Sequence, residues 1–114
     1  MTDIVAERTV AIDAAHPAFD GHFPGRPVLP GVALLAEVLE AAHGEPRLAA
    51  CIGAAPRLAV VKFLAPVGPG ASLAISFRLG ARMVDWQVHE GAREVASGQI
   101  ARTDIDGPHG AAPT

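Results

Sequence analysis

The sequence predicts an α+β fold in which one buried helix packs against a curved antiparallel sheet. From Gly31 onward the apolar residues follow helical spacing, and from about residue 57 they recur at every second position, with Gly or Pro in the gaps. A helix with an apolar face needs a sheet to cover it. At 114 residues, the chain can bury one core. We expect a single domain over residues 1–103 and a disordered Gly-, Pro- and Ala-rich tail over residues 104–114.

The first part of the chain is predicted to form a strand and then a long loop. In "ERTVAIDAAH", Val10 and Ile12 alternate with small or polar residues, which favours a strand. Residues 13–30 contain four prolines and two glycines. Because proline fixes φ and removes a backbone donor, this segment cannot form a regular helix and is predicted to be a stiffened loop.

The central helix is predicted to begin at Pro30 and Gly31 and to stop at Gly44 and Pro46. Its larger apolar side chains fall within one arc of about 160°, at 100° per residue. They are Val32, Leu34, Leu35, Val38 and Leu39. The helix is therefore expected to be nearly enclosed, with its glutamates on the opposite side.

Four strands are predicted in the second half, where apolar residues alternate with polar or small ones. The segments are "RLAVVKFLAPV", "ASLAISFRL", "RMVDWQV" and "REVASGQIAR". Trp86, on the third of these, is expected in the core or at a dimer interface. These strands form the antiparallel meander that the fold class requires.

Composition narrows the possible functions and locations. The net charge of −3 argues against general nucleic-acid binding, which depends on clustered cations. The longest apolar run, "GVALLAEVLEAA", is far short of the roughly 20 residues of a membrane span. The N-terminus lacks the apolar stretch of a signal peptide, so a cytoplasmic location is expected.

Cys51 is the single cysteine and is expected to be buried. No Cys/His spacing in the sequence predicts a metal site.

The segment "GHFPGRPVLPGV" places His22 in a proline-rich bend that leads into the helix at Gly31. The prolines limit backbone freedom, so the two residues are held in a defined relation. The first N–H groups of a helix have no intrahelical partner and can bind an oxygen that becomes negative. A fixed imidazole beside such N–H groups suits proton abstraction next to a carbonyl, as in thioester chemistry. The alternative is a loop histidine that makes only surface or capping hydrogen bonds.

This segment resembles the signature of the 3-hydroxyacyl-acyl carrier protein dehydratases, in which G-H-F-P-x-x-P-x-x-P-G-V leads into the central helix of a hotdog fold. Upstream "HPAFD" and downstream "VKFLAPVGPGASLAISF" are similar to the same family, so the resemblance covers about residues 10–102. The compact length, "LLAEVLEAA" and "VASGQI" resemble the shorter branch related to the dehydratases of aryl polyene clusters.

The resemblance implies dehydration of (3R)-3-hydroxyacyl thioesters to trans-2-enoyl thioesters, in fatty-acid or polyene-type synthesis. His22 matches the catalytic base, and Gly31 matches the glycine whose N–H holds the thioester carbonyl; Phe23 and Val32 are assigned to substrate binding. The substrate is carried on the phosphopantetheine of an acyl carrier protein, or on coenzyme A, and no separate cofactor is expected. Such proteins are at least homodimers that share active sites between subunits. Arg26 is a candidate contact for the carrier.

The sequence departs from this pattern at Ala36, where the family has a catalytic Glu or Asp fourteen residues after the histidine. Glu37 points about 100° away from position 36, whereas Glu40 is only about 40° off in direction and about 6 Å along the axis. Glu40 is thus one candidate for the acid. A second hypothesis is a heterodimer whose other hotdog subunit supplies the acid. A hotdog thioesterase or an inactive acyl-binding protein is a third.

Overall fold

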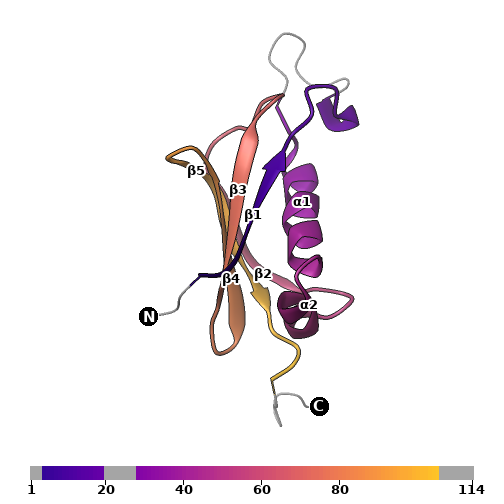
Figure 1. The fold of residues 1–114 in the computed structure, drawn as a ribbon, viewed down its shortest axis with the longest axis vertical. Coiled ribbons are helices and arrows are strands. Elements are labelled where there is room, and N and C mark those ends of the chain that lie inside the picture. The colour runs from indigo at the N-terminus through magenta and orange to yellow at the C-terminus, as the bar shows by residue number, and fades with distance from the viewer. Residues whose placement is uncertain (1–3, 20–27, 106–114) are drawn as a thin grey trace.

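The computed structural model describes residues 4–19 and 28–105. Along the chain it contains β1 (Ile4–Ala11), a short 3-10 helix (Pro17–Phe19), α1 (Gly31–His43), α2 (Pro46–Ile52), β2 (Leu58–Phe63), β3 (Ser72–Leu79), β4 (Met83–Glu90) and β5 (Arg93–Ala101). The five strands form one sheet, and α1 lies along one face of it (Figure 1). The α+β fold and the central helix predicted from the sequence are confirmed.

The strand order of the sheet is β1-β3-β4-β5-β2, and every neighbouring pair is antiparallel. β1 and β2 are therefore the two edge strands. β2 joins β5 on one side, although it precedes β3 in the chain. Among the described strands, none pairs with the other side of β2, which leaves the backbone groups of that side available to a further strand.

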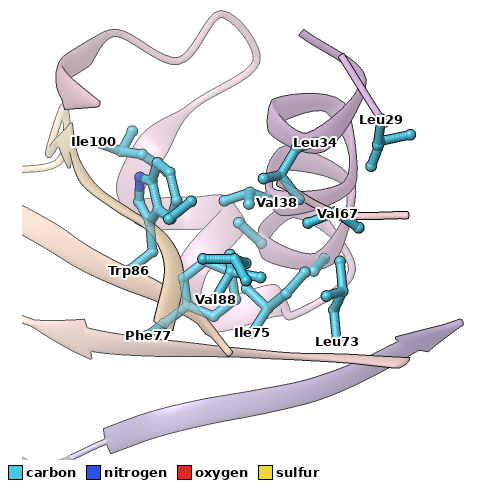
Figure 2. Close-up of a cluster of buried hydrophobic side chains, with 14 of the residues drawn as sticks. Leu29, Leu34, Val38, Val67, Leu73, Ile75, Phe77, Trp86, Val88 and Ile100 are labelled. Atoms are coloured by element: carbon cyan, nitrogen blue, oxygen red, sulfur yellow. The ribbon is translucent and has the colours of Figure 1, made fainter. Parts of the chain in front are cut away.

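The core lies between α1 and the inner face of the sheet. Alternate residues of β3 and β4 point toward the helix, as the two-residue period of a strand requires. Leu73, Ile75, Phe77, Trp86 and Val88 have at most 1% of their surface exposed, and Leu34 and Val38 of α1 meet them from above (Figure 2). The alternation predicted for these strands is confirmed, and Trp86 belongs to the core of the subunit.

The helix α1 is less enclosed than its sequence suggests. Its buried residues are Leu34, Val38, Ala41 and Ala42, whereas Val32 is 78% exposed. The prediction that one arc holding both Val32 and Leu34 would be covered is therefore wrong. The side of α1 at Val32 points away from the sheet, whereas Leu34 and Val38 face it (Figure 2).

A second helix, α2, was not predicted, because Pro46 was interpreted only as the stop of α1. Proline is also favoured in the first turn of a helix, where its missing N–H costs no hydrogen bond. Pro46 occupies that place in α2. The buried residues of this helix are Leu48, Cys51 and Ile52. Within the described residues, no helix is long and apolar enough to cross a membrane.

The predicted tail boundary at Asp104 falls close to the end of the described residues. Arg102 donates from Nε and Nη2 to the two carboxylate oxygens of Asp104, both at 2.9 Å, and from Nη1 to the carbonyl of Gly80 at 2.8 Å. The hydrogen bonds from Arg102 lower the pKa of Asp104. Residues 106–114 lie outside the described part, so the domain division at 103 stays a prediction.

Gly98 of β5 is expected to tolerate no side chain. It is paired with Trp86, and a Cβ built on it would meet both the Trp86 ring and the carbonyl oxygen of Val60. Gly98→Ala should therefore lower the free energy of unfolding by about 1–3 kcal/mol, the usual cost of overpacking. Chemical denaturation measures this, with Ser97→Ala on the opposite face of β5 as the control. Equal stabilities of the two variants would contradict the close packing of Gly98.

Candidate functional site

A pocket of about 720 Å³ lies at the N-terminal end of α1. The pocket is enclosed by residues 28–31, which enter α1, by residues 63–67, which start at the end of β2, and by Leu34 of α1. None of these residues has a charged or polar side chain. The polar groups that the pocket offers are therefore those of the backbone, which suits a largely apolar ligand with one polar group to hold.

Backbone hydrogen bonds hold the two sides of the pocket together. The N–H of Leu29 donates to the carbonyl of Val67 at 2.7 Å, and both side chains are buried. The N–H of Leu64 donates to the carbonyl of Val95 in β5 at 2.9 Å. The residues that precede α1 and those that follow β2 are thus fixed to each other and to the sheet. Figure 2 shows the Leu29 and Val67 side chains beside α1.

Gly31 is the first residue of α1 and lies in this pocket. The carbonyl of Pro30 accepts hydrogen bonds from Ala33 and Leu34 and so closes the first turn. The N–H groups of Gly31 and Val32 have no acceptor among the described residues. This is the state expected of the first N–H groups of a helix, whose partial positive charge favours a carbonyl or developing oxyanion.

The remaining sequence-predicted site residues divide into two groups. His22, Phe23 and Arg26 lie outside the described residues, so their roles stay predictions. Val32 is described, but its side chain is exposed and it is not among the residues that enclose the pocket. If Val32 contributes to substrate binding, it does so through its N–H group or from a surface that another chain would cover.

The structure does not bring Glu40 to the pocket that contains Gly31. Glu40 is nine residues further along α1, or roughly 14 Å along the axis. With Glu37, it lines a separate groove between α1 and Arg8 to Val10 of β1. The residues of the Gly31 pocket come instead from α1 and the end of β2, at the opposite edge of the sheet. Ala36 is exposed on α1 and offers no proton donor.

Sequence reasoning missed Phe63 and Leu64 as pocket residues. Phe63 is the last residue of β2 and Leu64 follows it, with 53% and 52% of their surfaces exposed. The segment was interpreted only as part of a strand. The available signal was the pair of consecutive large apolar residues in "VKFLAPV", which breaks the alternation expected of a strand with one solvent face.

The single cysteine lies on α2, outside the pocket. Burial raises the pKa of the Cys51 thiol, and the nearby Asp104 carboxylate acts in the same direction. A raised pKa keeps the thiol protonated and makes it a poor nucleophile. Within residues 4–19 and 28–105, no three His, Cys, Asp or Glu side chains gather as they would around a metal ion.

Comparisons with known proteins show the family to which this chain belongs. A model of the ApeI-like family, described as ApeI dehydratase, matches residues 2–99. The 3-hydroxyacyl-[acyl-carrier-protein] dehydratase FabZ of Bradyrhizobium diazoefficiens is 36% identical over 98 residues, which cover 78% of this chain and 62% of that protein. This chain therefore matches less than two thirds of that relative's length.

Solved structures show the same fold. The dehydratase heterocomplex ApeI:P from Xenorhabdus doucetiae superimposes with a TM-score of 0.66 and 20% identity, covering 90% of this chain and 97% of that one. The fluoroacetyl-CoA thioesterase FlK superimposes with a TM-score of 0.60 and 17% identity, covering 90% and 84%. At these identities the likeness shows the hotdog fold alone. Because the family model matches almost the whole of the described domain, this chain belongs to the ApeI-like dehydratase family.

Proposed function

We propose that this protein dehydrates (3R)-3-hydroxyacyl thioesters on an acyl carrier protein to trans-2-enoyl thioesters. The observation that carries the proposal is the "GHFPGRPVLPGV" segment, whose last residues bring the N–H of Gly31 to an apolar pocket at the start of α1. The family and the FabZ relative support a dehydratase. The apolar lining fits an acyl chain, and the backbone N–H fits its thioester carbonyl.

In the proposed reaction, His22 removes a proton from C2 while the N–H of Gly31 stabilises the enolate-like oxygen of the thioester. The electron pair of the C2–H bond then forms the C2–C3 double bond, and the bond from C3 to the hydroxyl breaks. The leaving hydroxyl takes a proton from an acid and departs as water. This last step needs a group that position 36 does not supply, because Ala36 has no titratable side chain.

The acid is proposed to come from a second hotdog chain. Glu40 lies in the groove beside Arg8, at the side of α1 that faces β1. The β2 edge lies next to the pocket and exposes Leu58, Val60 and Phe63, so a second subunit that pairs there would border the Gly31 site. The solved ApeI:P structure is itself a heterocomplex. A homodimer that retains weak activity is the alternative.

The carrier is proposed to approach the same end of the molecule. Acyl carrier proteins are acidic, and cations near the pocket mouth would attract them. Arg26 stands five positions before Gly31 in the sequence and is the candidate contact. Coenzyme A thioesters share the phosphopantetheine arm, so a comparison of the two substrates would separate recognition of the arm from recognition of the carrier.

Glu40→Gln is expected to change dehydration by less than about twofold, because the group lies outside the pocket. Turnover of 3-hydroxyacyl carrier thioesters by the purified protein, alone and with an acid-bearing hotdog partner, measures this. Glu37→Gln is the matched control on the same groove. A loss of about 10²-fold or more in Glu40→Gln alone would identify Glu40 as the acid.

The central experiment is turnover of 3-hydroxyacyl and trans-2-enoyl carrier thioesters, with size-exclusion chromatography of each mixture. Activity that appears only when a second, acid-bearing hotdog chain co-elutes would support the shared site. Release of free thiol without enoyl product would instead indicate a thioesterase. If neither product forms with or without a partner, the dehydratase proposal is wrong.

A further inference from the structure

Phe63 lies against the part of α1 that is proposed to hold the thioester carbonyl. A Cβ built on Gly31 would be 2.7 Å from Cζ of Phe63, and the three nearest atoms to that point all belong to the Phe63 ring. The ring therefore occupies the space directly beside the Gly31 backbone. A side chain at position 31 would require this ring to move.

We propose that Phe63 determines which acyl groups the site accepts, by limiting bulk at C2, the carbon next to the thioester carbonyl. This inference rests on the proposed function. When the thioester carbonyl oxygen accepts a hydrogen bond from the N–H of Gly31, the carbonyl carbon lies beside Gly31. C2 is bonded to that carbon and therefore lies close to the Phe63 ring. Unbranched 3-hydroxyacyl thioesters are the class that fits, and 2-methyl-branched ones are the class that Phe63 rejects.

Phe63 is the pocket residue beside Gly31 that can be replaced without disturbing the core. Leu34 also lines the pocket, but it is only 3% exposed and belongs to the core, so its replacement would unsettle the fold. Phe63 is 53% exposed at the end of an edge strand. Its ring can be shortened with a smaller loss of buried surface, and so the pocket can change while the core stays intact.

The test compares turnover of unbranched and 2-methyl-branched (3R)-3-hydroxyacyl carrier thioesters. The 2-methyl substrate keeps one C2 proton and can still lose water. One methyl group in a shaped apolar pocket typically changes kcat/KM by about 10–200-fold. We expect Phe63→Ala to raise the ratio of branched to unbranched kcat/KM by at least about tenfold, and Phe63→Leu to give an intermediate ratio.

Leu64→Ala is the matched control, because Leu64 is equally exposed and lines the same pocket but is not among the atoms nearest Gly31. Its ratio should stay within about twofold of the wild-type ratio. Wild-type dehydration together with an unchanged ratio in Phe63→Ala, or equal shifts in both variants, would overturn the role of Phe63 while leaving the proposed function intact. Absence of any dehydration by wild-type protein, with and without a partner, would overturn both.

A binding measurement separates size selection from a general loss of activity. Stable thioether analogues of the two acyl groups, titrated calorimetrically into the assembled protein, should bind wild type with a preference for the unbranched analogue. Phe63→Ala should lose most of that preference and still bind the unbranched analogue. An unchanged preference in this variant would contradict the inference.

Discussion

His22→Ala is expected to reduce dehydration of 3-hydroxyacyl carrier thioesters by about 10²–10⁴-fold, the usual contribution of one positioned acid–base group. The imidazole is the proposed base for the C2 proton, and alanine leaves no group to accept it. The loss should appear in kcat and far less in KM, because Gly31 and the apolar pocket remain. This loss is measured as turnover of the carrier thioester by the purified protein, together with a second hotdog chain if activity requires one.

His16→Ala is the control for that experiment, since His16 belongs to the same Pro-rich region but has a structural role. Its Nδ1 accepts a hydrogen bond from the N–H of Ala18 at 3.0 Å, at the 3-10 helix Pro17–Phe19. Its activity should stay within a few-fold of the wild type. Equal turnover in His22→Ala and the wild type would end the assignment of His22 as the base.

Ala36→Glu is expected to raise the rate of dehydration by the protein without an added partner by about 10²–10⁴-fold, because position 36 is where the dehydratases that this sequence resembles carry the acid, which they share between two subunits. Ala36 is exposed on α1, so the longer side chain meets no core residue in the subunit. Glutamate is also a good helix former, which keeps the expected stability change below about 0.5 kcal/mol. Initial rates of water loss and thermal unfolding measure the two effects.

Ala36→Gln controls for size and polarity without an ionisable group. It should remain at the wild-type rate, since an amide is a poor proton donor. A glutamine variant as active as the glutamate variant would show that position 36 acts through shape and would contradict the missing-acid hypothesis. A glutamate variant that forms a homodimer and is still no faster than the wild type would also contradict the missing-acid hypothesis.

The arrangement of the fold followed from local patterns in the sequence. Pro30 and Gly31 start α1 and Gly44 follows its last residue, as the start and stop signals predict. The alternation in residues 72–79 and 83–90 gave the strands that bury Phe77 and Trp86. These signals are reliable because they depend on neighbours within one turn or one strand.

The features that sequence reasoning missed depend on contacts between distant segments. Pro46 fits a helix stop as well as a helix start, and only the packing of α2 decides between them. Val32 shares the apolar arc of Leu34, yet the sheet covers one and not the other. Phe63 became a candidate only when β2 was placed beside Gly31, 32 positions away in the chain. No local periodicity carries that information.

The contact between Gly31 and Phe63 also bears on how related proteins can diverge. A side chain at position 31 would overlap the present position of the Phe63 ring, so a larger residue there requires either that the ring turns away or that a smaller residue stands at 63. Larger residues at position 31 should therefore be found mostly together with smaller residues at position 63. A lineage that evolved to accept branched acyl groups would be expected to change position 63 first, because Gly31 is the proposed oxyanion-binding residue and Phe63 has no proposed part in the proton transfers.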